Sequence, residues 1–251
     1  GQEFGDIHRT APPLLRYHGG MHPPSVAANI TEVRKRVSRA ATACGRDPAH
    51  ITLLAVSKTQ PAAAVRAAAA AGLHHFGENY LQEAEEKIAA CSDLDLCWHF
   101  IGPIQSNKTR RIAAAFQWVH SVDREKILRR LSEQRDAQLP PLNICLQVNV
   151  SGEASKAGTA PAALPALLDL AASLPRLRLR GLMAIPAAAA DFHAQKAACD
   201  RLAALLATAR QRHRGLDTLS IGMSADLEAA VAAGSTLLRI GSAIFGPRRV
   251  P

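Results

Sequence analysis

Short apolar runs alternate along this chain with longer segments in which apolar residues recur every three or four positions. Runs of four to eight residues rich in β-branched side chains are typical of strands buried on both faces, and the longer period is typical of amphipathic helices. The runs predict strands at 51–57, 74–78, 97–101, 117–121, 142–150, 178–185, 217–222 and 236–241. Helices are predicted between them at 61–71, 80–90, 106–115, 123–137, 160–173, 191–213 and 225–233, and one precedes the first strand at 25–43.

Several helix ends carry their own signals. Ser106, Asp123 and Ser224 stand where an N-cap oxygen is expected, and Gly72 and Gly234 stand where helices should end. Eight strands that alternate with helices indicate an α/β fold, a single (β/α)8 TIM barrel with an extra N-terminal helix. An open doubly wound sheet is the alternative, although no G-x-G-x-x-G follows the first strand.

Size and composition fit one barrel domain. The chain has 251 residues, of which 48% are hydrophobic, and no apolar run approaches the roughly 20 residues that a membrane-spanning helix needs. Residues 1–20 are rich in Gly, Pro and His and lack the apolar core of a signal peptide. We interpret them as a tag or a disordered extension, with residues 21–251, starting at Met21, as the barrel.

The net charge of +9 raises the question of a nucleic-acid partner. Aromatic residues make up only 4% of the chain, and the arginines are interleaved with acids on helical segments, so solvated helix faces are the favoured interpretation. A salt-dependent binding assay would separate the two. The five cysteines are odd in number and have no C-x-x-C spacing, which favours reduced thiols in a cytoplasmic protein over disulfides or a zinc site.

Lys58, at the end of the first predicted strand, is the first candidate for chemistry. Burial lowers the pKa of an ammonium group, and the resulting free amine can form a Schiff base with an aldehyde. A lone lysine more often extends into solvent. In this fold, however, active sites lie at the carboxyl ends of the strands, where Lys58 stands.

The seventh and eighth predicted strands end in small residues. Gly222, Met223, Ser224, Gly241 and Ser242 lie where barrels of this kind bind phosphate, and we call these five residues the phosphate cradle. Two ordinary tight turns are the alternative.

Three further side chains have roles that the pattern leaves open. Arg239 shares a strand face with Gly241, and that face points either into the barrel or outward. His99 is more typical of a hydrogen-bonded core histidine than of a catalytic one. Lys156 lies in the polar loop after the fifth strand.

A lysine on the first strand and a phosphate cradle on the seventh and eighth fit an aldehyde that carries a phosphate. The first and eighth strands are neighbours in a closed barrel, so the two features would share one site. Pyridoxal 5′-phosphate (PLP) has both groups, and its pyridine nitrogen needs a partner.

At this point the chain resembles the pyridoxal-phosphate homeostasis proteins of the YggS/PROSC type, relatives of the alanine racemase barrel, from about residue 25 to the C-terminus. The resemblance is carried by Ala55-Val-Ser-Lys-Thr59, Phe76-Gly-Glu-Asn-Tyr80, Trp98-His-Phe-Ile-Gly102, Gln105-Ser-Asn-Lys108, Arg180-Gly-Leu-Met-Ala184, Gly222-Met-Ser224, Arg239-Ile-Gly241 and Ile244-Phe-Gly246.

The resemblance implies a barrel of the alanine racemase N-terminal type that binds PLP. Lys58 would form the Schiff base, Ser224, Gly241 and Ser242 would hold the phosphate, and Arg239 would face the pyridine nitrogen. Asn79 would lie near the cofactor, and Met223 belongs to the cradle. Ser242 departs from the family, which often has threonine there.

The implied function is that of a cytoplasmic, monomeric PLP carrier and regulator, which passes the cofactor to PLP-dependent apoenzymes and affects amino-acid and keto-acid balance. The alternative is a PLP-dependent amino-acid racemase. Racemases of this type add a second domain that supplies a tyrosine base, whereas the only tyrosines here are Tyr17 and Tyr80. Without a second base we expect no enzymatic activity. We expect no metal, no nucleic acid and no membrane partner.

Overall fold

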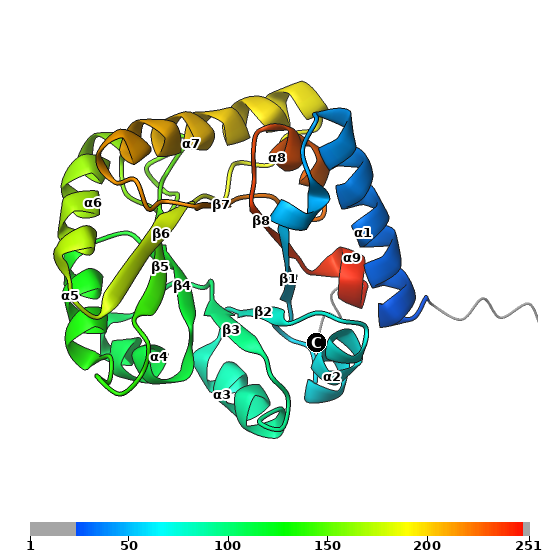
Figure 1. Cartoon of the computed structure of the whole chain (residues 1–251), viewed down its shortest axis with the longest axis horizontal. Coiled ribbons are helices and arrows are strands. Elements are labelled where there is room, and N and C mark those ends of the chain that lie inside the picture. Colours follow the sequence, from blue (N-terminus) through cyan, green and yellow to red (C-terminus); the bar gives the residue numbers. More distant parts are fainter. Residues whose placement is uncertain (1–23, 248–251) are drawn as a thin grey trace, which may run out of the picture.

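The computed structural model describes residues 24–247 and forms a closed barrel of eight parallel strands in chain order (Figure 1). The strands are β1 (Thr52–Val56), β2 (His75–Glu78), β3 (Cys97–Phe100), β4 (Trp118–Val122), β5 (Leu142–Gln147), β6 (Leu177–Met183), β7 (Thr218–Ser220) and β8 (Leu237–Ile240). Pairing of β1 with β8, Leu54 opposite Arg239, closes the barrel. The predicted (β/α)8 fold is confirmed, and the predicted extension 1–20 lies outside the described residues.

Helices surround the barrel (Figure 1). They are α1 (Val26–Ala43), α2 (Ala62–Ala70), α3 (Leu81–Ala90), α4 (Thr109–Ala115), α5 (Glu125–Gln134), α6 (Leu164–Ser173), α7 (Phe192–Arg212), α8 (Leu227–Ala232) and α9 (Ser242–Phe245). Single 3-10 turns occupy Pro48–His50, Ser106–Lys108 and Pro161–Ala163. The extra N-terminal helix is present as α1, whereas the short α9 was not predicted.

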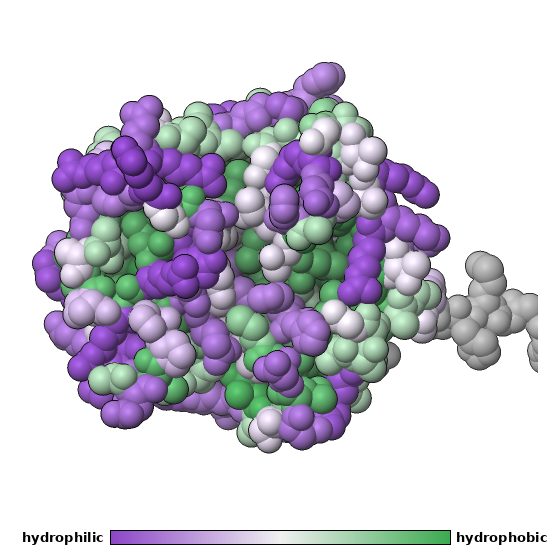
Figure 2. Space-filling model, in the orientation of Figure 1, coloured by the Kyte–Doolittle hydropathy of each residue, from purple (hydrophilic) through white to green (hydrophobic). Residues whose placement is uncertain are grey.

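The core fills the space between the barrel wall and the helices. In α5, Ile127, Leu128 and Leu131 are fully buried, while Arg129 and Glu125 form an exposed ion pair on the other side of the helix. This is the period expected of an amphipathic helix on a barrel. On the face shown in Figure 2, hydrophilic residues are spread around the rim and hydrophobic ones lie mostly in recesses between them.

The predicted helix ends are partly wrong. None of Ser106, Asp123 and Ser224 caps the helix that follows it, because α4, α5 and α8 start after Lys108, Arg124 and Asp226. A 3-10 turn or a loop separates each strand from its helix, so the capping oxygen stands too early in the chain. Gly72 and Gly234 do end α2 and α8, with φ of 94° and 105°.

The extra helix α1 is fastened to the β7–β8 side of the barrel. The Asn29 side-chain amide donates to the Ile244 carbonyl at 2.8 Å, and Arg36 bonds both Glu228 and the Ser224 carbonyl. These bonds hold α8, α9 and the loop between β7 and α8 against one another. Across residues 24–247 we find no helix long and apolar enough to cross a bilayer.

Candidate cofactor site

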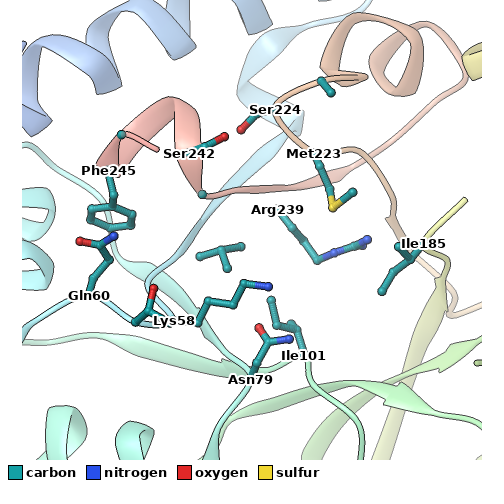
Figure 3. A pocket seen from close by; sticks show the side chains of 15 residues that line it. Lys58, Gln60, Asn79, Ile101, Ile185, Met223, Ser224, Arg239, Ser242 and Phe245 are labelled. Atoms are coloured by element: carbon teal, nitrogen blue, oxygen red, sulfur yellow. The ribbon is translucent and has the colours of Figure 1, made fainter. Parts of the chain in front are cut away.

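A pocket of about 300 Å³ lies at the carboxyl ends of the strands, between β1, β2, β7 and β8 (Figure 3). All seven residues predicted to bind the cofactor line it: Lys58, Asn79, Met223, Ser224, Arg239, Gly241 and Ser242. The lining also includes residues that the sequence did not single out, namely Val56, Thr59, Gln60, Ile101, Ile185, Ala225, Phe245 and Gly246. The structure thus brings together in one cavity Lys58 and four of the five cradle residues, whereas Gly222 is not among the residues that line it.

Lys58 sits in a tight turn directly after β1, and its side chain runs across the pocket toward Arg239 (Figure 3). The next residue, Thr59, has φ of 64°, a conformation that β-branched residues rarely adopt. The Thr59 amide donates to Glu83 Oε1 at 2.5 Å. Backbone strain of this kind persists where surrounding contacts enforce it, and it is typical of functional sites.

Those contacts come from a group of charged and polar residues that we call the Lys87 network: the buried Ser57, Glu78 and Lys87, and the partly exposed Glu83. The Lys87 ammonium is 2.6 Å from Glu78 Oε1, 2.7 Å from Glu83 Oε1, and donates to the Ser57 carbonyl at 2.5 Å. The Ser57 hydroxyl donates to Glu78 Oε1 at 2.6 Å. Burial raises the pKa of Glu78, and its bonds to Lys87 and Ser57 oppose that rise. The network holds both sides of the Lys58 turn. Only the i,i+4 spacing of Glu83 and Lys87 hinted at it in the sequence.

The other side of the pocket is built from small residues. A Cβ on Gly222, where φ is 108°, would lie 2.6 Å from both Ala230 Cβ and Leu238 Cδ2, so only glycine fits there. The Ser224 hydroxyl accepts a hydrogen bond from the Ala243 amide at 3.2 Å, which joins the β7 loop to the first turn of α9. In Figure 3 the hydroxyls of Ser224 and Ser242 point toward one another.

Met223 fits only part of its prediction. Its side chain lines the pocket and is 41% exposed. Its amide donates to Asp226 Oδ1 at 2.6 Å and is therefore not free to bind an anion. The cradle therefore offers hydroxyls and the backbone around Gly241, and not the Met223 amide.

Arg239 points into the barrel, which resolves the alternative left open by the sequence. It is 4% exposed, Nη1 donates to Ser220 O and Oγ at 2.8 and 2.7 Å, and Nη2 donates to Ala184 O at 2.9 Å. Burial lowers the pKa of the guanidinium to about 10, so it stays protonated at neutral pH. Three of its five N–H donors are used in these bonds, which leaves donors for a ligand.

His99 lies below the pocket, in the barrel interior, as a core histidine. His99 Nδ1 is 2.8 Å from His120 Nε2, and His120 Nδ1 is 2.8 Å from Ser220 Oγ, the hydroxyl that also bonds Arg239. Burial lowers the pKa of His120 to about 3, so it is neutral. Lys156, in the loop after β5, is not among the described residues that line the pocket.

The residues present fit a ligand with an anionic end and a carbonyl end. The buried Oδ1 of Asn79 has no hydrogen-bond partner within residues 24–247, which is costly unless a donor reaches it. Two hydroxyls beside Gly241 suit the oxygens of an anion, and the Lys58 amine suits a carbonyl carbon.

The fold and the site define a barrel of the alanine racemase N-terminal type, and the sequence model of the family described as alanine racemase, N-terminal domain, matches residues 25–249. Within that class, the chain belongs to the pyridoxal phosphate homeostasis protein family. It is 65% identical over 224 residues to the protein of that description from Pseudomonas aeruginosa, covering 89% of this chain and 96% of the relative.

Two further proteins that this chain is similar to support the same family assignment. The pyridoxal phosphate homeostasis protein of Escherichia coli is 52% identical over 226 residues, covering 89% of this chain and 97% of the relative. The solved structure of PipY from Synechococcus elongatus PCC7942 with PLP bound superposes with a TM-score of 0.78 at 37% identity, covering 88% of this chain and all of PipY.

Proposed function

We propose that this protein binds PLP in the pocket between β1 and β8 and serves PLP homeostasis. The observation that carries the proposal is the meeting of Lys58, two seryl hydroxyls and Arg239 in one cavity at the carboxyl ends of the strands. The relatives that share this chain's sequence are described as pyridoxal phosphate homeostasis proteins, and PipY has been solved with PLP bound.

Each pocket residue has a role in this proposal. The Lys58 amine attaches the aldehyde, and Ser224, Gly241 and Ser242 hold the phosphate. Arg239 faces the ring nitrogen, Asn79 accepts a hydrogen bond at the ring, and the Met223 side chain covers the open side. PLP supplies a reversible covalent link to the lysine and, in enzymes, an electron sink. Residues 21–251 would then form the PLP-binding domain.

Arg239 is the reason we propose a carrier and not an enzyme. Its guanidinium stays charged and can only donate, so beside the ring it disfavours a proton on the pyridine nitrogen. An unprotonated ring is a weaker electron sink, which protects bound substrate or cofactor from side reactions. Apart from Lys58, the described residues that line the pocket carry amide, hydroxyl, thioether or hydrocarbon side chains, or in Arg239 a protonated guanidinium, and none of these is a base. Two-base racemisation therefore lacks its second base.

The proposal extends to how the cofactor leaves. Ile185 and Met223 border the pocket and are 43% and 41% exposed, so the cavity opens to its surroundings. We propose that the protein acts as a cytoplasmic monomer and gives PLP to dependent apoenzymes, with no nucleic acid or membrane as partner.

The test is reductive trapping. Borohydride treatment of the PLP-loaded protein followed by peptide mapping should place the pyridoxyl group on Lys58, and Lys58→Ala should lose this label completely. Lys108→Ala and Lys156→Ala are matched controls and should keep the label.

A label found chiefly on Lys108 or Lys156 would show that the assignment is wrong. Turnover of alanine between its enantiomers at about 1 per second or faster, a rate typical of enzymes, would contradict the carrier role.

A further inference from the structure

Three metal-binding atoms converge at the amino-terminal end of the barrel, opposite the cofactor pocket. His75 Nδ1, Cys97 Sγ and His99 Nε2 all lie within 4.8 Å of one another. His75 begins β2 and pairs in register with Cys97, the first residue of β3. His99 follows two positions later on β3, so it shares the face of Cys97. Two neighbouring strands therefore direct three ligand atoms to one point.

The spacing of these atoms is close to that of a tetrahedral metal site. With Zn–N of about 2.0–2.1 Å and Zn–S of about 2.3 Å, two ligands of a tetrahedral zinc lie roughly 3.3 Å apart for N and N, and roughly 3.6 Å apart for N and S. Cys97 Sγ is 3.5 Å from His99 Nε2, and His75 Nδ1 is 2.9 Å from the same nitrogen. The two imidazole nitrogens would have to separate by a few tenths of an ångström, and His75 Nδ1 and Cys97 Sγ lie within 4.8 Å of each other.

His99 is oriented for ligation by a partner behind it. A metal on Nε2 requires the ring proton on Nδ1, and Nδ1 lies 2.8 Å from His120 Nε2. When His120 Nε2 accepts from His99, the ring proton of His120 lies on Nδ1, which can donate to Ser220 Oγ. The His99 ring also stacks on Trp118, with centroids 5.2 Å apart. Outer partners that fix the tautomer and ring plane of a ligating histidine are typical of metal sites.

One ligand of the cluster borders a cavity through which an ion could approach. His75 is half-buried and borders a cavity of about 410 Å³ at this end of the barrel. Arg34 also borders this cavity and donates to the carbonyls of Ala71 and Gly72, and the guanidinium of Arg180 over Trp118 is paired with Asp217 at 2.8 Å. An ion that approaches His75 from this cavity therefore passes the guanidinium of Arg34.

We propose that His75, Cys97 and His99 form a Zn²⁺ site, with a water molecule as the fourth ligand. One thiolate and two neutral imidazoles suit zinc, whereas Mg²⁺ and Ca²⁺ prefer oxygen ligands. As the Zn–S bond forms, the Cys97 thiol gives up its proton to solvent, so one proton is released for each ion bound. Our expectation of no metal rested on the spacing of cysteines alone, and it did not consider two histidines that complete the set.

The test titrates the full-length chain, stripped of metal with a chelator, with Zn²⁺ against a chromogenic competitor and separately with Co²⁺. We expect one equivalent of tight Zn²⁺ binding and a thiolate-to-cobalt charge-transfer band. Cys97→Ser should abolish the band, and both Cys97→Ser and His75→Gln should weaken Zn²⁺ binding more than about 100-fold, beyond the loss of an outer partner. Exposed residues of the same two types provide controls, because Cys44→Ser and His74→Gln should change neither the cobalt band nor the Zn²⁺ affinity.

Circular dichroism and PLP loading report whether each variant folds. If Cys97→Ser fails to fold, the Zn²⁺ affinity of His75→Gln decides the test alone. His75 is half-buried, so replacing it should disturb the fold less. The proposal is overturned if the native chain binds no equivalent of Zn²⁺ at micromolar concentration, or if the cobalt band survives Cys97→Ser. It is equally overturned if folded His75→Gln binds Zn²⁺ as tightly as the native chain. Because the readout is metal binding at the far end of the barrel, these outcomes are independent of whether PLP occupies the pocket.

Discussion

The two halves of the cofactor pocket differ in their residues: charged side chains support one half, and mainly small residues form the other. On the β1–β2 side, Lys58 stands in a strained turn that is held by the buried charges of Lys87 and Glu78 and by the partly exposed Glu83. On the β7–β8 side, the cradle consists of two glycines, two serines and Met223, and the ion pair of Arg36 with Glu228 lies outside the pocket and is partly exposed.

The difference follows from what each half has to hold. A nucleophilic amine must be aimed at one carbon atom, so its turn is fixed even in an unfavourable backbone conformation, and strong charge-assisted bonds supply that constraint. An anion needs close approach of the backbone and of hydroxyls on several sides, which small residues permit. The halves should therefore fail in different ways: the first through stability, the second through binding.

Lys87→Met should have the largest effect on stability. It leaves the carboxylate of Glu78 buried with only the Ser57 hydroxyl as partner, and removing one member of a buried pair costs about 3–5 kcal/mol. Glu78→Gln should cost less, because Lys87 keeps Glu83 and the Ser57 carbonyl. Urea denaturation measures both.

Lys196→Met is the matched control for Lys87→Met, since Lys196 forms an exposed i,i+4 pair with Asp200 worth about 0.3–0.5 kcal/mol. A cost for Lys87→Met below about 1 kcal/mol, or one smaller than that of Glu78→Gln, would show that the network does not constrain the Lys58 turn.

Two glycine variants should separate stability from binding within the cradle. Gly222→Ala places a Cβ 2.6 Å from Ala230 and Leu238 at positive φ, so it should destabilise by about 1–3 kcal/mol. At Gly241 a Cβ would meet Val56 at an ordinary 3.5 Å, so Gly241→Ala should change stability by less than about 0.5 kcal/mol. It should nevertheless weaken PLP binding, because the new methyl group stands in the pocket lining. Thermal unfolding and PLP titration measure the two effects. Normal PLP affinity in Gly241→Ala would remove Gly241 from the proposed phosphate site.

The sequence predicted the barrel and seven of the residues that line the pocket, because both depend on features that repeat. Strands buried on both faces form continuous apolar runs, and the fold places all strand ends in one ring. Lys58 and Ser242 could therefore be assigned to the same site from their positions alone, and both line the pocket.

The rest depends on side-chain direction and register, which the pattern does not resolve. The Lys87 network joins Ser57, Glu78 and Lys87 across 30 positions of the chain, and nothing in the apolar period says that these side chains turn inward together. The zinc ligands depend on the pairing of His75 with Cys97. Our predicted strands started at 74 and 97, and a shift of one residue moves a side chain to the opposite face.

The smallest effect should come from Arg36→Met, at the outer edge of the cradle. The bond to Arg36 holds the pKa of Glu228 below its usual value, and both side chains are partly exposed, so solvent screening limits the loss to about 1 kcal/mol or less at neutral pH. A depressed carboxyl pKa gives stability that is present above the unfolded-state pKa, near about 4.3, and is lost as pH falls through the folded-state value. The difference in unfolding free energy between native chain and variant should thus be full at neutral pH and shrink in acid.

Arg36 also donates to the Ser224 carbonyl at 3.0 Å, so PLP should bind slightly more weakly to Arg36→Met. Lys35→Met is the control: it breaks the exposed pair with Glu32 and should leave PLP binding unchanged. A stability difference that stays constant as pH falls through the carboxyl range would show that Arg36 acts through packing and not through its charge.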